Sequence, residues 1–157
     1  MQPSLRLRGG HVVGYAQDEP SQLARTVLAL MIQPLMGGQA FVARLIPVYK
    51  LSATFLQQQV EQLIKLVHEC NGNVLMLMCD NHIINRQFYH LMRQTTVPSE
   101  AHIGKHPCGC DFSLTLLYDP VHLLKNFRNN WISEATQTLS VELQPRGRTV
   151  KGAWSDD

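Results

Sequence analysis

The feature that most constrains the fold is an apolar run that ends in an acidic residue and is followed at once by proline. Leu114–Tyr118 has the composition of a buried strand, Asp119 ends it, and Pro120 follows. Asp is a favoured N-cap because its carboxylate accepts the free N–H groups of a first helical turn, and proline suits the first helical position. The order strand, cap, helix therefore predicts an α/β unit.

The helix that starts at Pro120 is predicted to have two faces. Apolar residues at helical spacing are expected to face a core, and the polar residues between them to face solvent. The apolar positions are Pro120, Leu124, Phe127 and Trp131, and the polar positions are His122, Lys125 and Asn129.

The bulk composition fits a single domain. A chain of 157 residues with 45% hydrophobic and 17% charged residues is typical of one soluble α/β domain with a sizeable core. The net charge of +2 neither requires nor excludes nucleic acid. Met1–Gly10 lacks the apolar centre of a signal peptide, and Val27–Met36 is too short to span a bilayer. Without a secretory signal, the cysteines predict a reducing compartment.

The N-terminal half predicts a β-hairpin. Two apolar runs, Thr26–Leu35 and Ala40–Tyr49, flank Gly37-Gly38, which favours a tight turn between strands. A helix over Ser21–Met36 also fits the 3.6-residue period, but the hairpin is the preferred interpretation. A short strand is expected within His11–Gln17.

The middle of the chain predicts helices alternating with strands. A helix capped by Ser52 or Thr54 is expected to end near Cys70, because Asn71-Gly72 is a stop signal. Asn73–Cys79 then predicts a strand buried on both faces, as in a parallel sheet covered by helices.

A second helix is expected over about Ile83–Gln94, followed by a polar loop over Thr95–Asp111. The residues expected to point inward from this helix are Ile84, Phe88, Leu91 and Met92. Residues 11–137 would form the domain, with residues 1–10 and 138–157 as irregular ends. Together these elements predict a mixed sheet with helices on its faces.

Asp80 is the first candidate for chemistry, because it directly follows the predicted strand over Asn73–Cys79. Open α/β sheets place their sites at the carboxyl ends of strands, and Mg²⁺ prefers carboxylate oxygens. Two-metal cleavage of a phosphodiester requires several such carboxylates close together. The structural alternative is that Asp80 or Asn81 only caps the helix at Ile83.

Two separate segments resemble P-element-like DNA transposases, a family that includes relatives with THAP domains. Cys79–Tyr89 is similar to the (V/C)CD-x-x-x-x-NR-x-(F/L)F segment that carries the family's second catalytic Asp. Asp119–Trp131 resembles the DPxHLxKxxRNxW signature, and the two segments occur in the family's order. The resemblance extends over nearly the whole chain from about His11. It implies an RNase H-like mixed sheet with flanking helices, in which Asp80 is a catalytic, metal-binding carboxylate.

The sequence also departs from this family. The family's first catalytic Asp lies in a segment resembling FDEM, ahead of the position of His11, and Met1–Gly10 contains no such segment. Asp18-Glu19 comes too late to replace it, and the family's last catalytic Glu lies downstream of Asp157. We therefore expect an RNase H-like domain without its first strand, which does not cleave DNA alone. An unpaired strand edge and marginal stability should follow.

The resemblance implies cofactors and partners for the complete protein. These are Mg²⁺, DNA at transposon ends, other transposase subunits and a nuclear location. Asp119 and Lys125 correspond to residues associated with GTP contact, and a carboxylate and an ammonium can recognise guanine and phosphate. Most of the inserted guanine-nucleotide-binding domain is absent from this sequence, which argues against GTP binding by the chain itself. The structural alternative has Asp119 as an N-cap and Lys125 solvated. A non-catalytic remnant that binds DNA or protein is the alternative function.

Two further groups carry weaker signals. Four residues of the loop, His102, His106, Cys108 and Cys110, could bind Zn²⁺, but Cys-Gly-Cys is not the usual ligand spacing, so a metal-free loop is preferred. Phosphate contact needs clustered positive charge, and most basic residues here are scattered, which favours a solvated face. The candidates are Arg86, Arg93, Lys125, Arg128, Arg146, Arg148 and Lys151.

Overall fold

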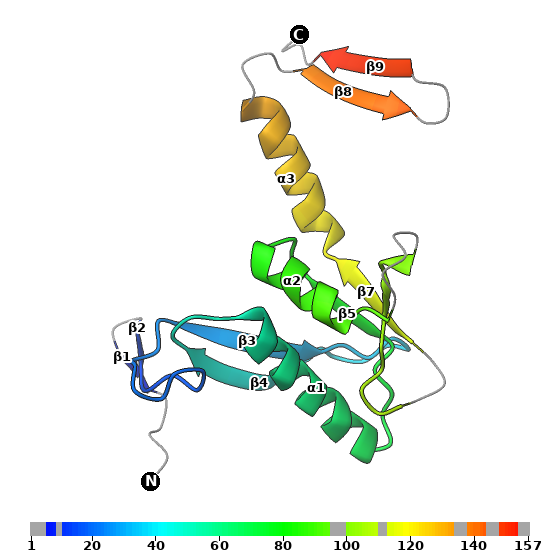
Figure 1. Ribbon diagram of the computed structural model, residues 1–157. Coiled ribbons are helices and arrows are strands. Elements are labelled where there is room, and N and C mark those ends of the chain that lie inside the picture. Colours follow the sequence, from blue (N-terminus) through cyan, green and yellow to red (C-terminus); the bar gives the residue numbers. More distant parts are fainter. Residues whose placement is uncertain are drawn as a thin grey trace.

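The computed structural model describes residues 6–8, 11–94, 100–109, 113–133, 138–143 and 148–153, with side chains described over 14–94, 100–109 and 113–129 (Figure 1). The strands are β1 (Arg6–Arg8), β2 (His11–Val13), β3 (Thr26–Ile32), β4 (Phe41–Val48), β5 (Met76–Cys79), β6 (Ile103–Gly104), β7 (Leu114–Tyr118), β8 (Thr138–Leu143) and β9 (Arg148–Ala153). The helices are α1 (Ala53–Glu69), α2 (Ile83–Met92) and α3 (Pro120–Ser133).

The expected α/β class, with a small mixed sheet and flanking helices, is confirmed at this level. The mixed sheet has the order β5-β7-β6, in which β5 is parallel and β6 antiparallel to β7. The described strands form separate small sheets, because β1-β2, β3-β4 and β8-β9 are each paired only with one another.

The hairpin interpretation of the N-terminal half is confirmed, and the alternative helix is wrong. β3 pairs with β4 in antiparallel register from Thr26↔Val48 to Ile32↔Phe41, with an irregularity between Leu30 and Met31. The turn between them contains Gly37 (φ 93°) and Gly38 (φ 116°), in the left-handed region that glycine occupies without steric cost.

Helix α1 begins and ends where the sequence predicts. The Ser52 side chain accepts a hydrogen bond from the backbone N–H of Phe55 at 3.2 Å, which caps the first turn. At the other end Asn71 adopts a left-handed conformation (φ 59°). Its N–H donates to His68 O at 3.0 Å and that of Gly72 to Val67 O at 2.9 Å. This pair of bonds is a Schellman motif, which satisfies the last carbonyls of the helix.

The main core lies where α1 and α2 meet the strands. Its fully buried members come from α1, α2 and β7, and they are Leu56, Val60, Ile64, Phe88, Tyr89, Met92, Leu114 and Leu116. Leu28 and Leu30 of β3 and Leu77 of β5 pack against the same cluster. Both the hairpin and the mixed sheet therefore share one core, although their strands do not pair.

Helix α2 confirms most of the predicted inward face. Phe88 and Met92 are buried and Ile84 packs against the core, as predicted. Leu91 is exposed, contrary to prediction, and Tyr89 is buried in its place. The buried face of α2 is therefore rotated about the helix axis relative to the predicted face. The apolar pattern alone does not determine this rotation.

The prediction that the strand over Asn73–Cys79 is buried on both faces is wrong. Leu77 and Cys79 pack against the core, but Met76 is 38% and Met78 is 57% exposed. The reason is that the α-helices cover only one face of β5, so that alternate side chains on the other face meet solvent.

The predicted core face of α3 is also wrong for its described side chains. Pro120, Leu124 and Phe127 are exposed, with Leu124 at 69% and Phe127 at 45%; the side chain of Trp131 lies outside the described residues. Figure 1 shows α3 projecting away from the sheet, with β8 and β9 at its far end. The apolar face therefore has little of the core against it.

The irregular ends expected at residues 1–10 and 138–157 contain strands. β1 pairs with β2, and β8 pairs with β9 from Thr138↔Ala153 to Leu143↔Arg148. The polar and basic composition of the ends outweighed the strand signal of Thr138–Leu143, in which polar and apolar residues alternate. The strand expected over His11–Gln17 is shorter than predicted and ends at Val13.

Candidate functional site

The candidate site lies at the carboxyl edge of β5 and β7. These neighbours are parallel and in register from Met76↔Thr115 to Cys79↔Tyr118. The backbone N–H of Asp119 donates to Cys79 O at 2.8 Å, immediately beyond the last ladder pair. The two aspartates that follow these strands, Asp80 and Asp119, are thereby brought to the same edge of the sheet.

Asp80 is exposed and has one carboxylate oxygen held in place. Its Oδ1 accepts from the backbone N–H of His82 at 2.9 Å and from Nδ2 of Asn85 at 2.8 Å. These two bonds fix the direction of the carboxylate from the loop and the first turn of α2. Among the described residues, Oδ2 has no hydrogen-bond partner, so this oxygen is open to a cation or to water.

The pKa of Asp80 lies below the ordinary value for an aspartate. The main cause is the hydrogen bond from the His82 backbone N–H, opposed by partial desolvation and assisted by the Asn85 amide. The imidazoles of His82 and His122 lower the pKa further by their charge. Asp80 is therefore ionised at neutral pH, as a metal ligand must be.

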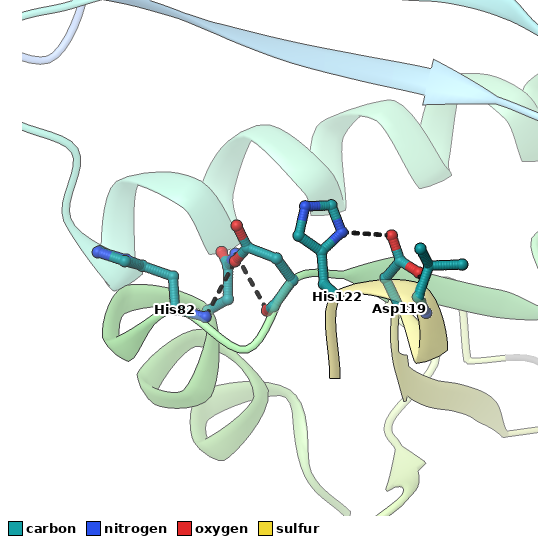
Figure 2. A network of polar contacts seen from close by, with 6 residues as sticks. His82, Asp119 and His122 are labelled. Atoms are coloured by element: carbon teal, nitrogen blue, oxygen red, sulfur yellow. Dashed lines mark hydrogen bonds and ion pairs between the residues drawn. The ribbon is translucent and has the colours of Figure 1, made fainter. Parts of the chain in front are cut away.

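Asp119 caps α3 and binds a histidine. Its Oδ1 accepts from the backbone N–H of Val121 at 2.9 Å, and its Oδ2 lies 2.6 Å from Nδ1 of His122. Figure 2 shows the His122 imidazole turned toward the Asp119 carboxylate. The His122 hydrogen bond is the largest cause of the lowered pKa of Asp119. The N-cap interpretation of Asp119 is confirmed.

His122 connects the two aspartates. Its Nδ1 is directed to Asp119, and its charge is the smallest of the causes that lower the pKa of Asp80. A carboxylate that holds one ring nitrogen fixes the ring and leaves the other nitrogen available. The arrangement can thus offer a carboxylate oxygen of Asp80 and an oriented imidazole to a ligand at this edge.

The donor set at this edge is small. Within the part of the chain that the structure describes, no group of three or more His, Cys, Asp or Glu side chains is placed to hold a metal ion. One carboxylate is nevertheless compatible with Mg²⁺, which commonly keeps several waters and takes only one or two protein carboxylates. The open Oδ2 of Asp80 meets that requirement as a single ligand.

The two residues predicted to contact GTP, Asp119 and Lys125, have different surroundings. Both carboxylate oxygens of Asp119 are engaged locally, by Val121 and His122. Lys125 is exposed on α3 and, among the described residues, has no hydrogen bond or ion pair. The solvated alternative for Lys125 agrees with this placement, and GTP contact stays a prediction.

The loop candidates for zinc are only partly described. His106 is buried, and its Nδ1 accepts from the Cys108 backbone N–H at 3.3 Å. Its ring lies 6.4 Å from that of His68, centroid to centroid, and burial lowers its pKa. His102 contributes its backbone carbonyl to Leu116 N at 2.8 Å, and Cys110 lies outside the described residues.

Two residues near the site were missed by sequence reasoning. Tyr89 is buried beneath it, with its hydroxyl 2.9 Å from Leu77 O and 2.7 Å from Leu117 O, so it ties β5 to β7. Asn85 orients Asp80, and its place one helical turn into α2 was the available signal. Asp18, which the sequence places too late to replace the first catalytic Asp, binds elsewhere: its carboxylate accepts from the backbone N–H groups of Tyr49 and Lys50, both at 2.8 Å.

The basic candidates for DNA contact do not form a described patch. Arg93 donates to Ala101 O at 3.1 Å, and Arg128 donates to the side chain of Asn129 at 3.2 Å. The side chains of Arg148 and Lys151 lie outside the described residues, as does Arg146. DNA contact by these residues therefore stays a prediction.

Comparisons with known proteins give no relative: no protein-family model matches the sequence, and neither the curated proteins nor the solved structures contain a match. Among the described residues, none of the helices is long and apolar enough to cross a membrane.

Proposed function

We propose that the chain is part of the RNase H-like domain of a P-element-like DNA transposase, with Asp80 as one of its metal-binding carboxylates. The observation that supports this most is the position of Asp80. It follows β5 at the carboxyl edge of a parallel strand pair, with Oδ1 held by His82 and Asn85 and with Oδ2 open. The resemblance of Cys79–Tyr89 to the family segment, in which the catalytic Asp corresponds to Asp80, supports the same proposal.

Each residue at this edge has a role in the proposal. Asp80 binds Mg²⁺ through Oδ2, and Asn85 keeps the carboxylate from rotating. Asp119 fixes the ring of His122 beside Asp80 and begins α3. In a complete domain, the metal ions would stabilise the charge that develops on the phosphate during DNA cleavage and strand transfer. DNA at transposon ends and a nuclear location belong to the same proposal.

One carboxylate cannot hold two metal ions in catalytic geometry, so this chain alone should not cleave DNA. Incubation with supercoiled plasmid and Mg²⁺ or Mn²⁺ is expected to leave the plasmid unnicked. Nicking that disappears in Asp80→Asn would show that the site is complete and would overturn this part of the proposal.

Metal binding is tested by titrating the ¹⁵N-labelled chain with Mn²⁺, whose unpaired electrons broaden nearby NMR signals. The amides of Asp80, Asn81 and His122 are expected to broaden first, and Asp80→Asn should remove the effect. Glu69→Gln is the matched control, since it neutralises an exposed carboxylate at the far end of α1. Broadening that survives in Asp80→Asn, or that centres on another carboxylate, would contradict the role of Asp80.

A non-catalytic binding protein is the second candidate, and the exposed apolar side chains favour it. Met78 of β5 and Leu124 of α3 are both more than half exposed. Weak, salt-sensitive DNA binding without metal binding would support this candidate over the first. GTP is tested in the same preparation: if millimolar GTP gives no heat and no shift of the Asp119 and Lys125 signals, GTP binding is excluded for this chain.

A further inference from the structure

Among the histidines whose side chains the structure describes, only His106 is buried, at 4% exposed. It begins a turn of residues 106–109, which follows β6. Gly109 closes this turn in the left-handed region (φ 67°), and its N–H donates to His106 O at 3.2 Å. The preceding residue, Lys105, donates its N–H to Met92 O at 2.8 Å. Residues 105–109 are therefore held to the end of α2 by their backbone, and they carry one buried imidazole.

The hydrogen bond within the turn requires His106 to be neutral. Its Nδ1 accepts from the backbone N–H of Cys108 at 3.3 Å. A backbone N–H can only donate, so Nδ1 must lack a proton, and the neutral ring carries its proton on Nε2. Protonation of Nδ1 would set two donors against each other across this contact and would place a positive charge in a buried position. The docked turn and the protonated ring are thus incompatible.

The groups packed around the ring also oppose a charge on it. His68, in the last turn of α1, places its ring 6.4 Å from that of His106, centroid to centroid. Burial is the main cause that lowers the pKa of His106, and the charge of His68 is the second. A hydrogen bond with the Val74 backbone acts in the opposite direction. Cys108 is the other titratable side chain of the turn and packs against the main core. No carboxylate among the described residues compensates a charge on the ring.

We propose that His106 is a pH-sensitive switch for this turn. The neutral imidazole holds residues 105–109 against α1 and α2, and its protonation releases them while α1, α2, β5 and β7 stay folded. The release is local because the fully buried core residues come from α1, α2 and β7, and residues 105–109 contribute none of them. The switch does not depend on the proposed metal site, since His106 is not among the groups that act on Asp80.

The direction of the pH effect follows from these contacts. The pKa of His106 in the folded chain lies below its ordinary value of 6.5, so the released turn binds more protons than the docked turn. Docking is therefore fully stabilised above this ordinary value, and the stabilisation is lost as pH falls through the lower folded pKa. The population of the released turn should rise several-fold between about pH 7.5 and about pH 5.

NMR of the unmodified chain tests the switch without any substitution. Long-range ¹H–¹⁵N spectra should show the His106 proton on Nε2 at neutral pH, and titration should give a pKa below 6.5. Over the same titration the protection of the Lys105, Cys108 and Gly109 amides should fall several-fold, while that of Ile64 in α1 is kept. A ring that titrates at or above 6.5, or constant protection at the turn, would overturn the proposal. A parallel loss at Ile64 would do the same, because the domain would then unfold as a whole.

Substitutions separate the protonation of the imidazole from its hydrogen bond. His106→Asn keeps an oxygen that can accept from the Cys108 N–H, but this side chain gains no proton. The pH dependence at residues 105–109 should disappear in this variant. It should persist in the matched control His90→Asn, which replaces an exposed histidine of α2. A transition that survives in His106→Asn, or that His90→Asn abolishes, would contradict the switch.

His68→Gln sharpens the test, because it removes the neighbouring charge without touching the turn. The transition should then move to higher pH, towards the ordinary value of histidine. An unchanged midpoint would contradict the role given to His68. If His106→Asn does not fold, the titration of the unmodified chain decides alone.

Discussion

The segments β5–Asp80–α2 and β7–Asp119–α3 have the same local arrangement in different surroundings. In each, a strand ends at an aspartate whose carboxylate accepts a backbone N–H two residues later, and a helix follows. Among the described strands, β5 lies at the edge of the mixed sheet and β7 at its centre. Helix α2 packs into the core, whereas α3 projects from the sheet. Among the described strands, β7 has two neighbours and is followed by the exposed helix α3. β5 has one neighbour and is followed by the buried helix α2.

Phe88 and Phe127 show the difference most directly. Each lies at the same separation along the chain from its aspartate, one on α2 and one on α3. Phe88 is 3% exposed within the core, and Phe127 is 45% exposed. The strand, cap and helix are therefore set by local sequence, while burial of the helix depends on what lies across from it.

The largest expected effect is on the core side of this comparison. Phe88→Ala should lower the free energy of unfolding by about 3–5 kcal/mol, because it removes a buried ring and leaves a cavity. Phe127→Ala should lower it by about 1 kcal/mol or less, since the ring is half exposed. Urea denaturation of both variants measures the two values. Equal losses would mean that α3 is packed in solution, contrary to the structure.

A smaller effect is expected from the tyrosines that accompany the two strands. Tyr89→Phe should cost about 1 kcal/mol, because the buried hydroxyl donates to the carbonyls that join β5 and β7. Tyr118→Phe is the matched control. The rings lie 5.1 Å apart, but among the described residues the Tyr118 hydroxyl has no hydrogen bond, so its loss should change stability by less than about 0.5 kcal/mol. Chemical denaturation measures both losses of stability. A larger loss in Tyr118→Phe than in Tyr89→Phe would contradict the role given to the Tyr89 hydroxyl.

The smallest effect concerns the two carboxylates. Both have pKa values below the ordinary aspartate value, so each stabilises the fold above that value and loses this contribution as pH falls through its folded pKa. His122→Ala should raise the pKa of Asp119 clearly, since the His122 hydrogen bond is the largest cause of its low value. The pKa of Asp80 should rise only slightly, since His122 is the smallest of its causes. NMR titration of the carboxyl carbons measures both. A larger pKa change at Asp80 than at Asp119 would show that His122 interacts with Asp80 in solution, contrary to the structure.

Local sequence signals predicted much of the fold. The glycines at 37 and 38 predicted the hairpin, and Ser52 and Asn71-Gly72 predicted the ends of α1. Asp119-Pro120 predicted the start of α3. These signals act through backbone conformation and hydrogen bonds between near neighbours, so they can be recognised without knowing the tertiary structure.

Burial could not be predicted in the same way. The apolar pattern of Met76 and Met78 is the same whether or not a helix or strand covers them, and Leu124 is equally apolar on a packed or a projecting helix. His122 and Asp80 are far apart in the sequence. They come to the same edge of the sheet only because β5 and β7 pair in parallel. Tyr89 was missed because its partners, Leu77 O and Leu117 O, are brought together by the same register. The partner of Asn85 is local, and its place one turn into α2 was a signal that could have been used.

Among the described strands, β5 is an open edge beside the interior strand β7. Native-state hydrogen exchange on dilute protein, read residue by residue by NMR, tests it most directly. An open edge predicts fast exchange at Met76 and Met78, and slow exchange at Leu77 and Cys79 of β5 and at Thr115, Leu116 and Leu117 of β7. Protection of Met76 and Met78 equal to that of Leu77 and Cys79 in dilute protein would contradict it, because their N–H groups would then already have partners.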